Sequence, residues 1–317
     1  MTSTQPSRGQ VYLSFALVYL FWGSTYLAMA VAVKHIPAAL MTGVRYSVAG
    51  PLMLAWCAFR GRKLRVTLAE LGHMFAISFL LLTCGNMLIV WTEQFIPSGL
   101  ASLFVAIVPL YVALVEGVFL RGDRLRGRGW FGLVLGLLGL ILLLWPKLQN
   151  AGGLGRQQLV ACFAVMLGSL CWACGSILSR HTKLTIDPST ATGWEMSMAG
   201  VTNLLIAVML GDFRTVEWAR SSLLAIGYLV VFGSWVGFTA YIWLLDHVPT
   251  PKVATYAYVN PLVAVLLGFL ILHEHLDRFS AMGMVVIIAA VAVITQSKLA
   301  TARSTPERML ASCESKG

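Results

Sequence analysis

The chain has 317 residues, of which 58% are hydrophobic and only 11% are charged, and its formal net charge is +10. A soluble domain carries about 25% charged residues, so this composition excludes a water-solvated globular protein and predicts that the lipid bilayer is its main solvent. The basic excess does not indicate nucleic-acid binding, because the Lys and Arg residues lie in short caps between apolar runs and form no aromatic-interleaved groove.

Ten apolar segments come close to the length of about 17–25 residues that a membrane-spanning helix needs. They are 11–33, 38–59, 72–93, 98–120, 130–146, 158–179, 191–211, 222–245, 252–272 and 280–297. The run after Arg8 resembles a signal peptide, but it continues to Val33, so we interpret it as a retained first helix. The links are too short for a soluble domain. We therefore expect an all-α polytopic membrane protein with ten transmembrane helices.

The distribution of basic residues predicts the orientation of these helices. If the N-terminus is cytoplasmic, 16 of the 23 Lys and Arg residues lie on the cytoplasmic side and 6 lie in outer loops, with Arg45 inside a helix. Positive residues gather on the cytoplasmic side of membrane proteins. We therefore expect both termini in the cytoplasm, with residues 298–317 as a cytoplasmic tail.

The chain also repeats itself. Residues 41–50 read MTGVRYSVAG and residues 191–200 read ATGWEMSMAG, and Trp22 recurs as Trp172 at the same offset of 150 positions. An internal repeat of membrane helices is typical of secondary transporters, which place a site between two equivalent halves.

This repeat predicts the arrangement of the two halves. The first five-helix repeat spans 11–146 and the second spans 158–297. Because five is an odd number, the second repeat enters the membrane from the opposite side. The repeats are therefore expected to be inverted about a pseudo-two-fold axis in the membrane plane, an arrangement that can rock to give alternating access to a midplane site.

Arg45 lies in the middle of the second apolar segment, and the position 150 residues further on is Glu195. Ionisable residues inside membrane spans are candidates for function. One interpretation is that the two opposite charges bind a zwitterionic substrate, whose carboxylate contacts Arg45 and whose ammonium group contacts Glu195. The other is a salt bridge that fixes helix packing. The residues alone leave both open.

Glu93 ends the third segment, and Asn86 lies two turns earlier on a similar face. Glu93 and Glu195 are the candidates for coupling transport to protons, and Asn86 is a candidate substrate ligand. The alternative for Glu93 is a carboxylate wetted at the membrane interface.

Pro109 and Pro261 occupy matched places in the fourth and ninth segments, 152 positions apart. Proline removes a backbone donor and frees a carbonyl, and broken helices at matched places indicate a binding site. A kink for packing is the alternative. Aromatic and amide side chains are further candidates for lining a cavity, although each also suits packing or an interfacial belt: Trp22, Tyr26, Trp172, Tyr241, Tyr258 and Asn260.

Two patterns suggest other chemistry. Cys171 and Cys174 form a CxxC pair, as in thiol oxidoreductases, but the outer loops offer no second pair to relay electrons. His273 and His275 are too few for zinc, and their spacing splits them across a helix. We expect no catalytic residue, no metal, no cofactor and no enzyme activity. The absence of GxxxxGK[ST] also argues against pumping driven by ATP.

Several stretches together carry a family resemblance. They are FWGSTY (21–26), TGVRYSVAG (42–50), GNMLIVWTEQFIPSGLASL (85–103), GSLCWACGSILSR (168–180), GWEMSMAG (193–200), ATYAYVNPLVAVLLG (254–268) and HEHL (273–276). The chain resembles the EamA family of the drug/metabolite transporter superfamily over nearly its whole length. The resemblance implies ten helices in two inverted repeats, cytoplasmic ends, and export of small metabolites from a central cavity.

We therefore expect a secondary transporter that exports amino acids or similar zwitterionic solutes across the inner membrane, coupled to protons. The alternatives are a cationic drug exporter or a flippase for lipid-linked intermediates on the same fold, and passive facilitation. The expected partners are a small-molecule substrate, the lipid bilayer and protons, but no nucleic acid. Whether the chain forms a homodimer stays open.

Overall fold

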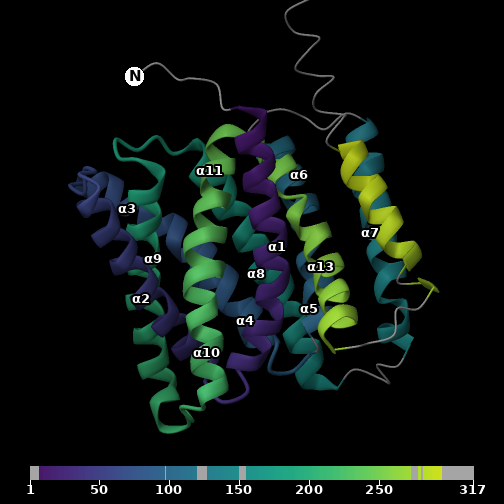
Figure 1. The fold of residues 1–317 in the computed structure, drawn as a ribbon, viewed down its shortest axis with the longest axis horizontal. Helices are drawn as coiled ribbons and strands as arrows, with labels where there is room; N and C mark the ends of the chain where they lie inside the picture. Colours follow the sequence, from purple (N-terminus) through teal and green to yellow (C-terminus); the bar gives the residue numbers. More distant parts are fainter. Residues whose placement is uncertain are drawn as a thin grey trace, which may run out of the picture.

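The computed structural model describes residues 7–96, 98–119, 127–149, 155–272, 278–279 and 281–294, and these residues are almost wholly helical and contain no strand. Figure 1 shows the helices running side by side as a bundle. Each of the ten predicted segments is mostly helical where it is described, which confirms the all-α polytopic fold. Five helices are long and apolar enough to cross a membrane: Arg8–Ala32, Leu68–Thr92, Arg156–His181, Pro188–Leu210 and Arg220–His247.

The first repeat contains seven α-helices and one π-helical segment. These are α1 (Arg8–Ala32), α2 (Ala38–Phe59), α3 (Leu68–Ser78), the π-helical η1 (Phe79–Met87), α4 (Leu88–Thr92), α5 (Ser98–Val105), α6 (Val108–Phe119) and α7 (Gly127–Gln149). In the second repeat lie α8 (Arg156–His181), α9 (Pro188–Leu210), the 3-10 turn η2 (Asp212–Arg214), α10 (Arg220–Tyr228), the π-helical η3 (Leu229–Phe238), α11 (Thr239–His247), α12 (Thr250–Val253) and α13 (Tyr256–Leu272). A further helical stretch covers 281–294.

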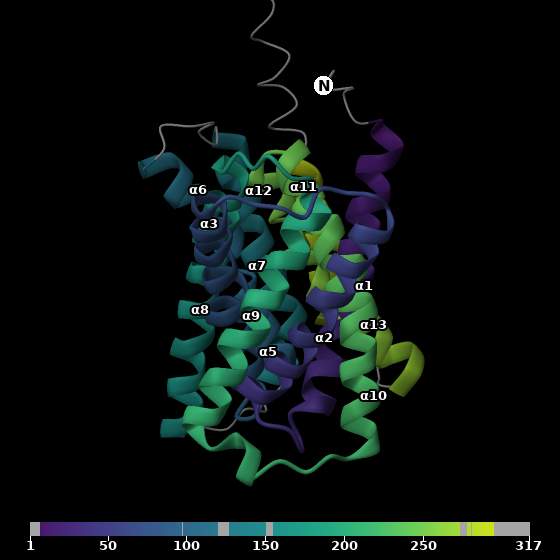
Figure 2. The same cartoon turned by 90° about the vertical axis from the view of Figure 1, so that its left-hand side faces the viewer.

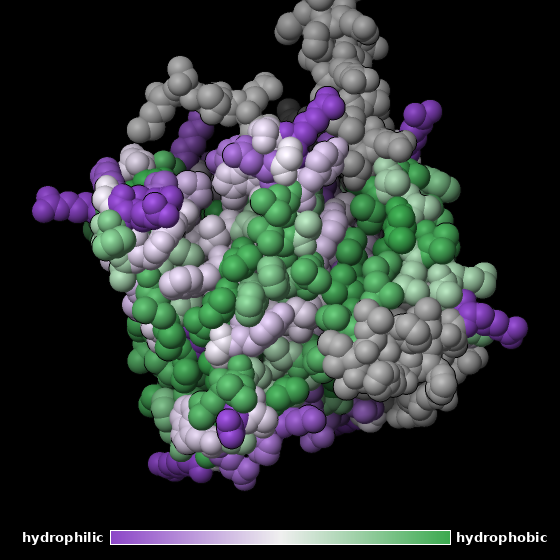
Figure 3. Space-filling view, in the orientation of Figure 1, coloured by the Kyte–Doolittle hydropathy of each residue, from purple (hydrophilic) through white to green (hydrophobic). Residues whose placement is uncertain are grey.

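The outer surface of the bundle is apolar. Figure 3 shows a green hydrophobic band between purple hydrophilic ends. Large exposed side chains on this surface include Leu13, Phe163, Leu205, Met209 and Ile288. Contiguous apolar surface of this kind is what a bilayer requires of the helices that face it.

The closest packing of the two repeats is between α2 and α9, which lie side by side in Figures 1 and 2. A Cβ atom added to Gly50 would lie 2.4 Å from the backbone nitrogen of Ser197, and one added to Gly200 would lie 2.5 Å from that of Ser47. Gly200 and Ser197 are the repeat partners of Gly50 and Ser47, so the two contacts are equivalent. The pseudo-two-fold axis that relates the inverted repeats therefore passes between α2 and α9.

The third and eighth spans share a feature that the apolar pattern did not predict. Each contains a π-helical stretch, η1 and η3, and the two begin 150 positions apart. π-helical turns are rare and often occur at functional sites, because they open the regular hydrogen-bond ladder of a helix. Both stretches contribute to the cavity described below.

The fourth and ninth spans are both interrupted, but not at equivalent residues. The break between α5 and α6 falls at Ala106 and Ile107, directly before Pro109. The break between α12 and α13 falls at Ala254 and Thr255, whereas Pro261 lies inside the continuous helix α13. A hinge role for the two prolines stays a prediction.

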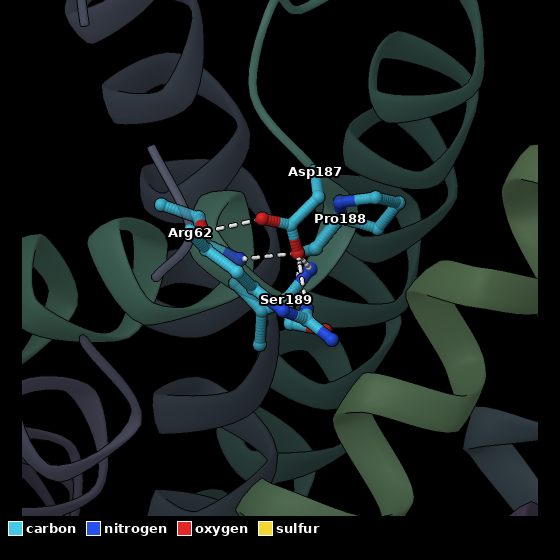
Figure 4. A network of polar contacts seen from close by, with 6 residues as sticks. Arg62, Asp187, Pro188 and Ser189 are labelled. Atoms are coloured by element: carbon cyan, nitrogen blue, oxygen red, sulfur yellow. Dashed lines mark hydrogen bonds and ion pairs between the residues drawn. The ribbon is translucent and has the colours of Figure 1, made fainter. Parts of the chain in front are cut away.

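Carboxylates cap both ends of the α2–α9 pair. Asp187 Oδ1 accepts hydrogen bonds from the backbone nitrogens of Ser189 and Thr190, at 3.1 and 3.3 Å, in the first turn of α9. The same oxygen lies 2.5 Å from Arg62 Nη1, just beyond the end of α2 (Figure 4). At the other end, Asp212 Oδ2 accepts from the backbone nitrogen of Leu40 at 3.3 Å. Acidic groups at helix N-termini satisfy free amides and oppose the helix dipole.

This cap predicts a pH dependence of stability. Burial alone would raise the pKa of Asp187, but the Thr190 hydrogen bonds and the Arg62 charge outweigh it and lower the pKa below 3.8. A carboxyl whose pKa is lower in the folded state stabilises the fold above its unfolded-state pKa, and loses this contribution as the pH falls through the folded-state pKa. We therefore expect Asp187 to contribute to a loss of thermal stability as the pH is lowered below about 4.

The variant Asp187→Asn isolates this contribution, because asparagine is also a good N-cap but does not titrate. Its melting temperature should depend less on pH in the acid range than that of the native protein. The ion pair is about one-third exposed, so its own contribution is about 0–1 kcal/mol. Burial raises the pKa of Asp212, so its contribution to stability changes with pH in the opposite direction. Asp212 is present in both proteins, so it does not affect the comparison. Identical acid profiles for the two proteins would contradict the assignment.

Candidate functional site

A cavity lies between the two repeats, with walls from both. Its volume is about 50 Å³, which is enough for one or two water molecules. Six of the residues predicted to form the site line it: Trp22, Tyr26, Arg45, Asn86, Trp172 and Asn260. The structure therefore brings together side chains from α1, α2, η1, α8 and α13 that lie far apart in the sequence.

Arg45 is the charged group of this cavity. Its side chain is 4% exposed, its Nε donates to Ser234 Oγ at 2.8 Å, and its guanidinium carbon lies 4.9 Å from the centre of the Tyr46 ring. Its Nη1 is buried and has no hydrogen-bond partner among the described residues. A fixed guanidinium with a free donor is suited to bind a carboxylate.

The backbone of η3 makes room for this guanidinium. A Cβ atom on Gly233 would lie 2.7 Å from Arg45 Nη2, so a larger residue there would displace the guanidinium. The carbonyl oxygen of Gly233 also accepts a hydrogen bond from Trp22 Nε1 at 3.1 Å. One glycine in the π-helical stretch therefore positions both a charged and an aromatic side chain of the first repeat.

Trp22 and Trp172, which the repeat relates by symmetry, meet in the wall of the cavity. Their rings pack edge to face, with 5.5 Å between centroids and 83° between planes. Trp172 Nε1 donates to the hydroxyl of Tyr241 at 3.1 Å, and that hydroxyl lies 2.5 Å from Ser176 Oγ. Tyr241 thus stands behind the wall, where it orients Trp172, and the wall offers an apolar solute aromatic surface.

Asn86 projects from η1 and also lines the cavity. Its Oδ1 accepts a hydrogen bond from the Tyr46 hydroxyl at 2.8 Å, which leaves the amide NH₂ group as a donor. Asn86, Ile89 and Glu93 follow at spacings of three and four residues, so they share one helix face. Asn86 and Ile89 both line the cavity.

Besides Tyr241, three of the residues predicted to bind substrate or protons lie outside the lining. Glu195 is 1% exposed in α9, and its Oε2 has no hydrogen-bond partner among the described residues. Tyr258 donates to the carbonyl of Leu133 at 3.3 Å and packs beside Gly136 of α7, in a separate cluster. Glu93 lies one turn beyond Ile89, and its two carboxylate oxygens are buried without a partner among the described residues.

Arg45 and Glu195 do not form an ion pair in this structure. The three ion pairs among the described residues are His35–Glu217, Arg62–Asp187 and His247–Asp246. The matched charges of the two repeats therefore stand apart, with Arg45 at the cavity and Glu195 packed against the third span, where its carbonyl accepts from Ser78 Oγ at 2.6 Å.

The alternative chemistries find no assembled site in the part of the chain that the structure describes. Cys171 and Cys174 are both free thiols. Among the described residues no group of three or more His, Cys, Asp or Glu is placed to hold a metal ion. His273 and His275 lie outside the described residues.

Sequence reasoning missed several residues of the site. Tyr46, Gly233, Ser234 and Phe238 either contact Arg45 or line the cavity, and three of these four lie in η3. The signal for Tyr46 was its position directly after Arg45. The residues of η3 could not be assigned a face, because a π-helix does not follow the 3.6-residue period on which such assignments depend.

The sequence is similar to those of known proteins. The sequence pattern of the EamA-like transporter family matches residues 10–145 and 159–296, which correspond to the two repeats. The chain belongs to the EamA-like transporter family. The inner membrane transporter YedA of Escherichia coli K12 is 37% identical over 285 residues, which cover 90% of each chain. The transporter YoaV of Bacillus subtilis is 24% identical over 283 residues, which cover 89% of this chain and 95% of YoaV.

The EamA-like fold is also seen in a crystal structure that superposes with a TM-score of 0.77 at 20% identity and covers 92% of this chain and 98% of the other. A WAT1-related chloroplastic protein of Arabidopsis thaliana is 25% identical over 283 residues, which cover 87% of this chain and 67% of that protein. With its apolar helices, this EamA-like chain is an integral protein of the inner membrane.

Proposed function

We propose that this chain is a secondary active transporter that exports small zwitterionic or amphipathic metabolites, such as amino acids, by alternating access. The observation that supports it most is the free Nη1 of Arg45, a buried donor in a cavity that aromatic side chains also line. Inverted repeats with a polar site between them are the usual architecture of such transporters.

The proposed binding mode follows from the side chains of the cavity. A substrate carboxylate would bind the guanidinium of Arg45, which Ser234 and the Tyr46 ring already orient. Apolar parts of the substrate would contact Trp22 and Trp172. The free NH₂ group of Asn86 would donate a further hydrogen bond.

The cavity must widen to admit such a substrate, because its present space holds only one or two water molecules. In the proposed cycle the α2–α9 contact stays closed, since its glycines allow no intervening side chain, and the surrounding helices rock around it. The hydrogen bond from Trp22 to Gly233 joins α1 to η3 and would have to break when these elements separate. We also propose that both termini are cytoplasmic, from the distribution of Lys and Arg residues.

An ion gradient is the proposed source of energy, with protons carried by Glu93 or Glu195. Both are buried carboxylates with at least one oxygen that lacks a hydrogen-bond partner among the described residues. Carboxylates inside membrane spans commonly relay protons in transporters.

Proteoliposomes test the coupling directly. Purified protein should accumulate a labelled amino acid against its gradient when a pH gradient is imposed, and accumulation should stop when an ionophore collapses that gradient. Glu195→Gln and Glu93→Gln, each reconstituted separately, should show which carboxylate is needed. Accumulation that is unchanged by collapse of the pH gradient would contradict proton coupling, and equilibration without accumulation would indicate passive facilitation.

A cationic drug exporter or a flippase for lipid-linked intermediates remains the second candidate. The aromatic wall of the cavity favours it, because the faces of aromatic rings attract cations. This alternative predicts that organic cations are transported and that Arg45 is not needed.

A further inference from the structure

Glu93, Tyr26 and Asn260 gather at one edge of the cavity. Tyr26 in α1 and Asn260 in α13 both line the cavity. The Asn260 amide lies against the Tyr26 hydroxyl, and Glu93 is close enough to Tyr26 to interact with it electrostatically. The helices that carry them are packed together, since α1 contacts α13, and α5 contacts α1, α4 and α13.

Three oxygen atoms of this cluster are buried acceptors without a donor among the described residues. Both carboxylate oxygens of Glu93 and the Oδ1 of Asn260 have no hydrogen-bond partner among the described residues. Asn260 is only 2% exposed. Arg45 does not pair with Glu93, because none of the three ion pairs in the described part of the chain involves either residue. A buried carboxylate without a compensating positive charge is strongly unfavourable.

Helix irregularities add acceptors of a second kind to the same helices. Pro109 has no amide hydrogen, so the carbonyl of Val105, a residue that lines the cavity, lacks its regular helical partner. Pro261 likewise frees the carbonyl of Ala257, one turn before Asn260. In transporters, carbonyls at irregular points of membrane helices coordinate coupling ions.

We infer that Glu93, Asn260 and Tyr26 form a binding site for a monovalent cation at the edge of the cavity. Carboxylate, amide and hydroxyl oxygens are ligands suited to hard cations. One carboxylate supplies one negative charge, which a monovalent cation neutralises. That cation is either an inorganic ion such as Na⁺ or the primary ammonium group of a solute whose anionic group binds Arg45.

This inference deepens the proposed function and rests on it for the role of the cation in transport, but cation binding itself requires no transport. It also assigns different roles to the two buried carboxylates. Glu93 holds the cation, which leaves Glu195, outside the cavity lining, as the proton carrier. In a zwitterionic substrate the ammonium group then faces Glu93 and not Glu195.

The test is thermal unfolding of the purified full-length protein at fixed pH and constant ionic strength, in choline chloride progressively replaced by NaCl, KCl or methylammonium chloride. We expect a saturable rise in melting temperature with Na⁺ or with methylammonium. Glu93→Gln and Asn260→Leu should each abolish it. Glu195→Gln is the matched control, because it neutralises a buried carboxylate away from Tyr26 and should keep the response.

The choice of salts distinguishes an inorganic ion from the ammonium group of a substrate. A response to Na⁺ assigns an inorganic ion, and a response to methylammonium alone assigns the ammonium group of the substrate. Equal stability in all four salts, or a response that survives Glu93→Gln, would overturn the inference. Tyr26→Phe and Asn260→Leu keep the test valid if Glu93→Gln does not fold, since neither alters a charge.

Failure of the site and failure of the proposed function can also be told apart. If the cation response is present but proteoliposomes move no solute, the cation site stands and the transport proposal fails. If carboxylate binding is lost in Arg45→Gln but cations do not change the melting temperature, the proposed function stands and the cation site fails.

Discussion

Replacing Arg45 with glutamine should reduce the affinity for a carboxylate-bearing substrate by about 10- to 100-fold. The reason is that Arg45 Nη1 is a buried, charged donor without a partner in the described structure, and a hydrogen bond to a charged group contributes about 1.5–3 kcal/mol. Glutamine keeps a polar side chain of moderate length but lacks both the charge and the planar fork. Binding of a phenylalanine-like amino acid, measured by isothermal titration, gives the change directly.

Two controls make the result specific. The decarboxylated amine of the same solute should bind the native protein and Arg45→Gln with similar affinity, because it has no carboxylate to lose. Arg45→Lys should retain part of the affinity, since it keeps the charge but not the bidentate geometry. Full carboxylate affinity in folded Arg45→Gln would make Arg45 a structural residue that holds η3 through Ser234.

The second large effect is expected at the contact between the repeats. Gly50→Ala and Gly200→Ala should each destabilise the protein by about 1–3 kcal/mol, the usual cost of overpacking. In each case the added Cβ meets backbone and not a movable side-chain end, at 2.4 Å from Ser197 N and 2.5 Å from Ser47 N. The two losses should be similar, because the contacts are symmetry-related.

Gly72→Ala and Gly227→Ala are the matched controls, since a Cβ at either position meets no atom within 4 Å. Alanine favours a helix over glycine, so these two variants should keep or slightly raise the melting temperature. Thermal unfolding in detergent compares all four. If Gly50→Ala and Gly200→Ala have the same melting temperature as the controls, α2 and α9 are not the fixed contact of the bundle.

Much of this architecture could be predicted from the sequence, because a membrane limits what a chain can do. Apolar length specifies the helices, and the recurrence of Trp22 as Trp172 and of Gly50 as Gly200 specifies the inverted repeats. Arg45, Trp22 and Trp172, which sequence reasoning singled out, all line the cavity, although the contact between the two tryptophans was not predicted.

What the repeat could not predict is the asymmetry of the two halves. Arg45 lines the cavity, whereas its symmetry partner Glu195 lies outside the lining. In one state of an inverted-repeat protein the two halves differ in conformation, so equivalent residues meet different surroundings. Tyr258 shows a second limit, since it packs on α7, and aromatic residues of cavities and of helix contacts look alike in a sequence.

The irregular stretches were also beyond sequence reasoning. Neither η1 nor η3 contains a proline, and nothing in their apolar runs distinguishes a π-helix from an α-helix. Conversely, Pro261 marked a place where α13 in fact continues, while the break falls earlier, at Ala254 and Thr255. Neighbouring helices can satisfy the backbone groups that a proline frees, so a proline alone does not locate a break.

The most direct test of the account is a thermal-unfolding screen of the purified native protein against amino acids, sugars, nucleosides, organic cations and lipid-like amphiphiles. A ligand at about 100 times its dissociation constant stabilises a protein by about 2.7 kcal/mol, which such a screen detects readily. The account predicts stabilisation by amino acids or similar zwitterions. Stabilisation by organic cations or lipid-like molecules alone would contradict it and would favour a cation exporter or a flippase on the same fold.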